Sequence, residues 1–329
     1  MTQTVLLDRY HRVINYLRVS VTDRCNLRCA YCMPEEGVRP LDHAEVLSYE
    51  EILRVARVAV RMGIHKVRIT GGEPMVRRGL LGFLGELAAI PGIRDLSLTT
   101  NGVLLAGMAR DLRAAGLRRV NVSLDTLRPE RFERITRRPG LERVVEGIRA
   151  ARAAGLEPVK VNVVAMRGFN DDEILDFVDF ARQEGVEVRF IEFMPAGGAW
   201  DRRRVVPAAE ILDTLLARHP FEPAGRETAS GPSRTYRLPD GTRVGVISPL
   251  SDHFCGTCNR LRLTAAGRLR TCLFSDREVD LRRVLRSGAD DRALEAVLRA
   301  AVAQKPEGHG MAADAPCGAD RPTMSRVGG

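Results

Sequence analysis

Short hydrophobic runs typical of β-strands alternate with amphipathic, helix-like stretches along the first 200 residues or so. A strand and a helix recur about every thirty residues, and this alternation predicts a parallel sheet with right-handed helical crossovers. The predicted strands span residues 16–22, 66–70, 95–100, 119–124, 158–164 and 187–193. Six units are too few for a closed eight-stranded barrel, so we predict an α/β fold with a partial, laterally open (βα)6 barrel.

The helical stretch at 48–63 carries its own start and stop signals. Ser48 and Glu51 form a capping box at its beginning, and Gly63 follows its last periodic position. In parallel barrels, ligand-binding residues collect where the strands end. We therefore expect the chemistry of this chain in the loops that follow the predicted strands.

Composition narrows the class of protein without naming it. The chain has 329 residues, of which 44% are hydrophobic, enough for one large core or a core with an appended module. No apolar stretch is long enough to span a membrane. The formal charge of +9 rests on arginine, because lysine occurs only at Lys66, Lys160 and Lys305. Such a charge attracts nucleic acids, nucleotides or phosphorylated metabolites.

Three cysteines, Cys25, Cys29 and Cys32, follow the first predicted strand with the spacing C-x3-C-x2-C. A disulfide framework does not fit a chain with an odd number of cysteines, seven, and no apolar signal segment. Cysteines without disulfide partners favour a cytoplasmic location. A structural zinc site needs four ligands, usually in two separated pairs. Three thiolates can instead hold a [4Fe-4S] cluster and leave one iron open for another ligand.

This spacing, with Tyr31 directly before the last cysteine, resembles the radical S-adenosylmethionine (SAM) superfamily. The resemblance implies a barrel of radical SAM type, and a cluster whose open iron chelates SAM and whose electron cleaves SAM to a 5′-deoxyadenosyl radical. The stretch TGGEP at 70–74 reads alone as an ordinary turn but here resembles the superfamily's SAM-amino-group motif. The positions that match SAM-binding positions are Tyr31, Gly72, Ser123 and Met194.

A second group of three cysteines, Cys255, Cys258 and Cys272, lies in the C-terminal third of the chain. A zinc ribbon with His253 as fourth ligand is one interpretation. The other is a second [4Fe-4S] cluster whose open iron holds a substrate. The spacing C-x2-C-x13-C with an embedded N-R-x-R-L-T resembles the GTP 3′,8-cyclase family of radical SAM enzymes, from about residue 10 to residue 329.

That resemblance implies a reaction and its substrate. The radical abstracts the ribose 3′ hydrogen of GTP, and the product is (8S)-3′,8-cyclo-7,8-dihydroguanosine 5′-triphosphate, an early intermediate of molybdenum cofactor biosynthesis. Guanidinium groups suit the phosphate oxygens of such a substrate. The positions that match the family's GTP-binding positions are Arg18, Arg68, Thr99, Lys160, Arg260 and Arg262, with Lys66 and Arg189 as further candidates.

The last two residues, Gly328 and Gly329, resemble the family's double-glycine tail. Chain ends are commonly disordered, and that is the simplest interpretation of composition alone. Glycine can also thread a narrow cavity, so we expect the tail to reach the GTP site and act in catalysis. Cys317 lies outside both cysteine groups, and we expect it to be a free thiol.

The resemblance also implies partners and a division of the chain. We expect a radical SAM barrel in residues 1–205 and the second cluster in residues 206–329. A reducing electron donor must act on the enzyme, and cyclic pyranopterin monophosphate synthase takes the product. The sequence leaves the assembly state open, with a homodimer as one candidate, and indicates no membrane or nucleic-acid partner.

Two alternatives remain from other classes of protein. A radical SAM enzyme with a second cluster could modify a peptide or RNA, and the positive charge would suit RNA. However, the sequence has no aromatic-rich basic stripe and no RNA-binding motif. A non-catalytic, metal-binding nucleic-acid module is the other alternative, and the repeated strand and helix pattern argues against it.

Overall fold

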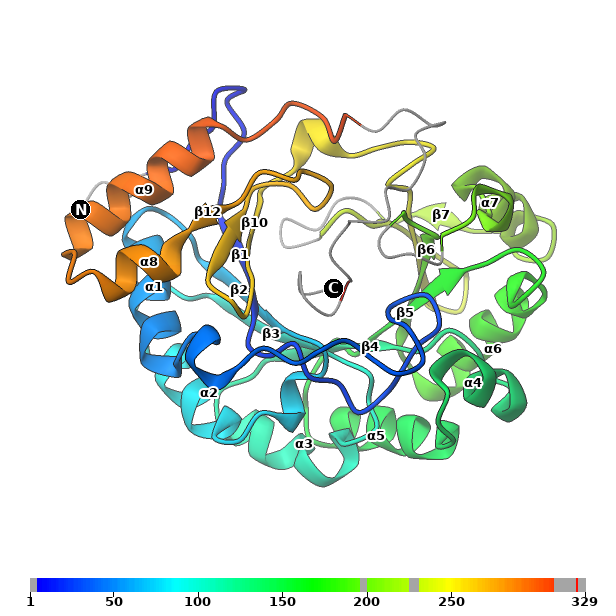
Figure 1. Ribbon diagram of the computed structural model, residues 1–329. Helices are drawn as coiled ribbons and strands as arrows, with labels where there is room; N and C mark the ends of the chain where they lie inside the picture. The colour runs from blue at the N-terminus through cyan, green and yellow to red at the C-terminus, as the bar shows by residue number, and fades with distance from the viewer. Residues whose placement is uncertain (1–4, 196–199, 225–230, 311–323, 325–329) are drawn as a thin grey trace.

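One curved sheet runs through the chain and bends into a barrel that does not close (Figure 1). The computed structural model describes residues 5–195, 200–224, 231–310 and 324. Six central strands lie side by side in sequence order and run parallel. They are β1 (Tyr16–Ser20), β2 (Lys66–Thr70), β3 (Asp95–Thr100), β4 (Arg119–Ser123), β5 (Lys160–Ala165) and β6 (Glu187–Glu192).

Both edges of this six-stranded core are extended by strands from the C-terminal third of the chain. Strand β9 pairs in parallel with β6, and β10 pairs in parallel with β1. Antiparallel strands then complete each edge, in the overall order β12-β11-β10-β1-β2-β3-β4-β5-β6-β9-β8-β7. These outer strands are β7 (Glu222–Pro223), β8 (Arg234–Arg237), β9 (Arg243–Ile247), β10 (Arg260–Leu263), β11 (Arg268–Arg270) and β12 (Val279–Asp280). The predicted partial barrel with a C-terminal extension is confirmed.

Helices cover the outer, convex face of the sheet (Figure 1). They are α1 (Tyr49–Arg61), α2 (Leu80–Ala88), α3 (Leu105–Ala114), α4 (Pro129–Thr136), α5 (Leu141–Ala153), α6 (Ile174–Glu184), α7 (Ala208–Leu216), α8 (Leu281–Arg286) and α9 (Asp291–Ala303). Helix α1 begins as predicted, because Ser48 accepts a hydrogen bond from the Glu51 N–H and Glu51 accepts one from the Ser48 N–H. Gly63 follows this helix with a φ of 108°, a value that favours glycine.

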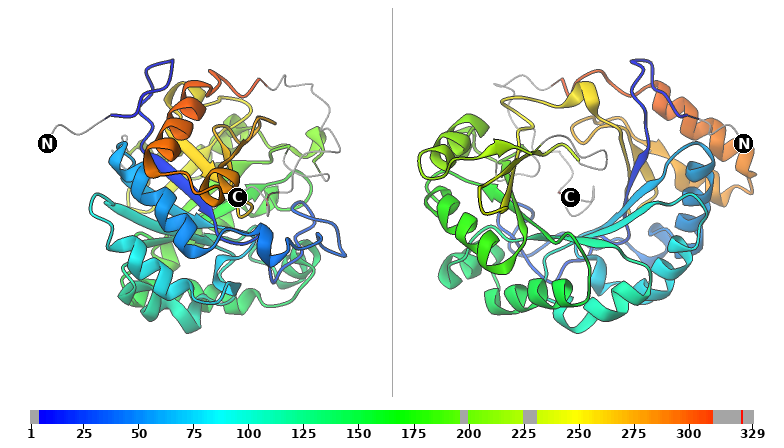
Figure 2. Two further views of the ribbon diagram at one scale, coloured as in Figure 1. Left: turned by 60° about the vertical axis from the view of Figure 1, so that its left-hand side comes forward. Right: turned by 180° about the vertical axis from the view of Figure 1, so that it is seen from behind.

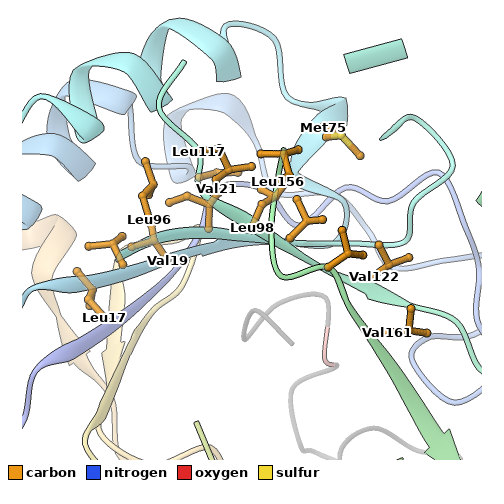
Figure 3. Close-up of a cluster of buried hydrophobic side chains, with 14 of the residues drawn as sticks. Leu17, Val19, Val21, Met75, Leu96, Leu98, Leu117, Val122, Leu156 and Val161 are labelled. Carbon is orange, nitrogen blue, oxygen red and sulfur yellow. The ribbon is translucent and has the colours of Figure 1, made fainter. Parts of the chain in front are cut away.

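The core lies between the sheet and these helices. Alternate residues of a strand point to opposite faces, and on the outer face they are apolar and buried, as Leu17, Val19, Leu96 and Leu98 show (Figure 3). Burying one such side chain stabilises the fold by about 1.5 to 3 kcal/mol. The residues between them in the sequence, Arg18 among them, therefore face the inside of the barrel.

The last two helices return to the beginning of the chain. Helix α9 packs beside α1 (Figure 2), where Asp291 pairs with Arg54 at 2.9 Å and with Arg61 at 2.8 Å. Arg286 of α8 pairs with Glu51 of α1 at 2.7 Å. These partly exposed ion pairs contribute little energy individually, but they lie where the C-terminal segment meets the first unit of the barrel.

Candidate active site

A cavity of about 310 Å³ is lined by inward-facing residues of the strands and by the loops at their C-terminal ends. Parallel strands buried on both faces are usually apolar throughout. Here the inner face is polar instead, with Arg18 of β1, Arg68 of β2, Asn121 of β4 and Arg189 of β6 among the lining residues. The barrel interior is thus suited to a polar, anionic ligand rather than to a packed core.

All three cysteines of the first group line this cavity, in the loop that follows β1. The Cys25 Sγ accepts hydrogen bonds from the Leu27 N–H at 3.4 Å and the Asn101 side-chain amide at 3.8 Å. Burial raises the pKa of Cys29, and the neighbouring Cys32 and Asp125 raise it further. Three thiols held together in this way fit a metal cluster whose positive charge favours their deprotonated form.

The paired glycines after β2 pack directly against the backbone of this cysteine loop. A Cβ atom on Gly72 would lie 2.7 Å from the carbonyl carbon of Arg24, too close for any side chain. The Gly72 N–H donates to the Thr22 carbonyl oxygen at 2.8 Å, and the Glu73 N–H to that of Arg24 at 2.8 Å. Gly72 also lines the cavity, so only glycine can hold the loop and face a ligand here.

The other residues that match SAM-binding positions, Tyr31, Ser123 and Met194, line the same cavity. The Tyr31 hydroxyl donates to the Asp125 carboxylate at 2.8 Å. Burial raises the pKa of Asp125 to about 6, although its hydrogen bonds from the Val164 N–H and Tyr31 lower it. The sequence analysis did not predict Asp125. Its position two residues beyond the end of β4 is a signal that could have revealed it.

Three buried glutamates, also missed, clamp the loops at the mouth of the barrel. Each has no exposed surface: Glu73, Glu173 and Glu192. Glu73 accepts the Asn101 N–H at 2.7 Å, Glu173 the Leu127 N–H at 2.7 Å, and Glu192 the N–H groups of Ala208, Leu250 and Ser251 at 2.8 to 3.0 Å. These carboxylates satisfy backbone donors that the loops could not satisfy alone.

The second cysteine group lines the same cavity as the first. Burial raises the pKa of Cys258, but the charges of Arg260 and Lys305 outweigh it and lower that pKa to about 6. The Arg260 guanidinium lies 3.5 Å from the Cys258 Sγ and 4.7 Å from the Phe254 ring centre. Cys258 therefore favours the thiolate, the form in which cysteine binds metal.

His253, the alternative zinc ligand, lines the cavity and lies 5.2 Å from the His309 ring. Among the described residues, no group of three or more His, Cys, Asp and Glu side chains is arranged to hold a single metal ion. A [4Fe-4S] cluster does not require such convergence, because each thiolate binds a different iron. The cysteines of both groups fit this kind of cofactor.

The residues expected to bind GTP are largely brought together. Arg18, Arg68, Thr99, Arg260 and Arg262 line the cavity, as do the further candidates Lys66 and Arg189. Lys160 is not among the lining residues.

Lys160 instead pairs with Glu187 at 3.0 Å, deep in the barrel. Burial and the charge of Arg189 lower the pKa of Lys160 to about 8. Glu187 also pairs with Arg189 at 2.6 Å, so this carboxylate holds two of the cations expected near GTP. Gly328, Gly329 and Cys317 lie outside the described residues.

Comparison with known proteins agrees with this geometry. Residues 19–181 match the radical SAM superfamily, and residues 186–311 match the Molybdenum Cofactor Synthesis C family. The chain is a radical SAM protein. It is 51% identical to the GTP 3′,8-cyclase of Pelotomaculum thermopropionicum, covering 98% of this chain and 99% of that one. The enzyme of the same name from Geobacter sulfurreducens is also 51% identical, with 98% and 99% covered. The chain belongs to the GTP 3′,8-cyclase family.

Solved structures support the fold. Streptococcus suis SuiB bound to S-adenosylmethionine superposes with a TM-score of 0.58 at 14% identity, covering 88% of this chain and 69% of that one. A second structure of SuiB gives a TM-score of 0.60. None of the helices in the described part of the chain has the length and hydrophobicity of a membrane span.

Proposed function

We propose that this chain is a radical SAM GTP 3′,8-cyclase, which converts GTP to (8S)-3′,8-cyclo-7,8-dihydroguanosine 5′-triphosphate in molybdenum cofactor biosynthesis. One observation carries the proposal: two groups of three cysteines and a set of arginines line one cavity. Neither a single cluster nor a phosphate site alone would need this combination. A reaction that brings a radical source and a second open cluster to one nucleotide does need this combination of cysteines and arginines.

In this proposal Cys25, Cys29 and Cys32 hold the first [4Fe-4S] cluster, and Cys255, Cys258 and Cys272 hold the second. When bound, the first cluster and SAM supply the 5′-deoxyadenosyl radical that abstracts the ribose 3′ hydrogen. Tyr31, Gly72, Ser123 and Met194 hold SAM beside the first group.

The arginines bind the triphosphate. Arg260 and Arg262 lie on β10, which begins two residues after Cys258, so a nucleotide at the second cysteine group has its phosphates within their reach. Arg18 is the register partner of both Arg68 on β2 and Arg262 on β10, which brings three guanidinium groups to one level of the barrel. Bidentate contacts of this kind stabilise phosphate binding and fix the position of the ribose.

The glycine tail is part of the proposal as a catalytic element. Met324, a described residue four positions before Gly328, lines the cavity, and this supports a tail that reaches the substrate. The proposal also includes the division into residues 1–205 and 206–329 and a cytoplasmic location. Its partners are a second copy of the chain in a homodimer, a reducing electron donor and the synthase that takes the product.

The test is an anaerobic assay of the reconstituted protein with reductant, SAM and either GTP or RNA. We expect two [4Fe-4S] clusters per chain and GTP-dependent formation of 5′-deoxyadenosine together with the cyclised nucleotide. Formation of 5′-deoxyadenosine that responds to RNA or a peptide but not to GTP would contradict the proposal.

A further inference from the structure

Lys305 is a buried cation behind the second cysteine group, outside the set of residues that line the cavity. It follows helix α9, and only 2% of its surface is exposed. Its Nζ donates hydrogen bonds to the carbonyl oxygens of Arg260, at 3.1 Å, and Thr271. Its third contact is with the Cys258 Sγ at 3.5 Å. Lys305 therefore contacts the second cysteine group from outside the cavity lining.

These three contacts match the three donors of an ammonium group. The two carbonyl groups belong to the two segments that carry cysteines, because Arg260 follows Cys258 by two residues and Thr271 directly precedes Cys272. Lys305 therefore ties these segments together. Carbonyl oxygens do not compensate a full buried charge, whereas a thiolate does.

We propose that Lys305 is a positioning residue for the second cysteine group, and that its positive charge raises the reduction potential of the cluster bound there. This inference rests on the proposed function, which places a [4Fe-4S] cluster on Cys255, Cys258 and Cys272. Reduction adds negative charge to a cluster, so a nearby buried cation and an N–H···S hydrogen bond stabilise the reduced form.

Arg12 provides a matched control, because it holds the Cys255 end of the first of these segments. It is also buried, and it donates to the carbonyl oxygens of Cys255 at 2.8 Å and Pro306 at 2.6 Å. Lys305 has no carboxylate partner among the described residues, whereas Arg12 pairs with Asp8 at 2.6 Å, and this carboxylate compensates its charge. Arg12 thus holds Cys255 and the chain beside Lys305 in place with little net charge, while Lys305 holds the two cysteine segments together and adds charge.

The experiment uses the full chain with Cys25, Cys29 and Cys32 replaced by serine, so that only the second cluster is reconstituted. Lys305→Gln, Lys305→Arg and Arg12→Gln are compared in this parent by iron and sulfide content, by the EPR spectrum of the reduced cluster and by a redox titration. We expect Lys305→Gln, which keeps an N–H donor but loses the charge, to shift the midpoint potential to more negative values and alter the spectrum. Lys305→Arg should restore both toward the parent.

Arg12→Gln should lower the melting temperature and leave the midpoint potential at that of the parent. Equal potentials and spectra in the parent and Lys305→Gln would overturn the inference. If Lys305→Gln loses its cluster, the test rests on Lys305→Arg. A Lys305→Arg variant that keeps the cluster at the parent potential supports the inference, and one that loses the cluster overturns it. A wild-type chain that binds only one cluster, or does not act on GTP, would contradict the proposed function instead.

Discussion

At the scale of single residues, the two cysteine groups face one cavity but have different tasks in the proposed reaction. Replacing Cys29 by serine should abolish SAM cleavage, because no other site is expected to bind the cofactor. Replacing Cys258 by serine should leave some uncoupled cleavage of SAM and remove the cyclised product. Chromatography of 5′-deoxyadenosine and of the nucleotide product measures both. Full cyclase activity in Cys258→Ser would refute a substrate-holding role for the second group.

Arg262 is a buried cation of the cavity and lies near other arginines. Burial lowers its pKa well below the usual value, and the charges of Arg18 and Arg260 lower it further. An anionic ligand relieves that repulsion, so Arg262→Ala should weaken GTP binding by about 1.5 to 3 kcal/mol, roughly 10- to 150-fold in Kd. The control is Arg268→Ala, which removes an arginine that is 39% exposed, pairs with Asp280 and lies outside the cavity lining. Calorimetry should find Kd unchanged in the control, and an unchanged Kd in Arg262→Ala would argue against phosphate binding at this position.

The site residues that sequence predicted and those it missed differ in how they are encoded. Closely spaced cysteines carry their chemistry in their spacing, so the sequence alone predicts all six as cluster ligands, and all six line one cavity. The clamping glutamates are single acidic residues, and Glu173 acts on a loop 46 residues earlier in the chain. Nothing local distinguishes such a residue from a solvated one. The register that brings Arg18, Arg68 and Arg262 together is also a property of the folded sheet.

At the scale of elements, the six central strands were predicted to within a few residues. Their outer faces repeat apolar residues and their ends carry turn signals, both of which are local patterns. Strands β9 and β10 were not predicted. The alternation of arginine and leucine in β10 is equally consistent with an exposed strand, and its parallel pairing with β1 joins residues 244 positions apart, such as Tyr16 and Arg260. Such pairings depend on closure of the whole barrel.

The buried glutamates that hold the loops predict how the stability of the fold depends on pH. Burial raises the pKa of Glu73 from 4.5 to about 7, although its hydrogen bonds from Asn101, Met75 and Thr100 lower it. The folded chain therefore binds this proton more tightly than the unfolded chain, and stability falls as the pH rises from about 4.5 to about 7. The contribution lost is on the order of 3 kcal/mol. Glu73→Gln should remove this part of the pH dependence while weakening the clamp at every pH.

Urea unfolding of the cluster-free chain between pH 5 and pH 8 measures the effect. Glu51→Gln is the control, because Arg286 holds the pKa of Glu51 below its usual value and its contribution is lost only in more acidic solution. The wild type and this control should show the same slope of unfolding free energy against pH. A Glu73→Gln variant with that same slope would contradict the assignment.

At the scale of the whole molecule, the C-terminal third completes the barrel wall as well as the active site. It supplies the parallel neighbours of both β1 and β6, the two edges of the six-stranded core. Leu261 and Leu263 of β10 and Val244 and Val246 of β9 are buried and continue the apolar outer face of that core. The sheet is therefore continuous across residue 205, the boundary that the sequence suggested between the radical SAM barrel and the region of the second cluster.

This continuity predicts how the two parts behave when separated. A fragment of residues 1–205 would leave the backbone donors and acceptors of β1 and β6 unpaired at two exposed edges. It would also expose side chains of α1 that now pack against α9, and side chains of α6 that now pack against α7. We expect the fragment to be oligomeric or aggregated by size-exclusion chromatography, and to unfold at a lower temperature than the full chain. Coexpression with residues 206–329 should restore a 1:1 complex with an increased melting temperature, because the edge pairings then reform. A monomeric 1–205 fragment with the stability of the full chain would show that the barrel is independent of its extension.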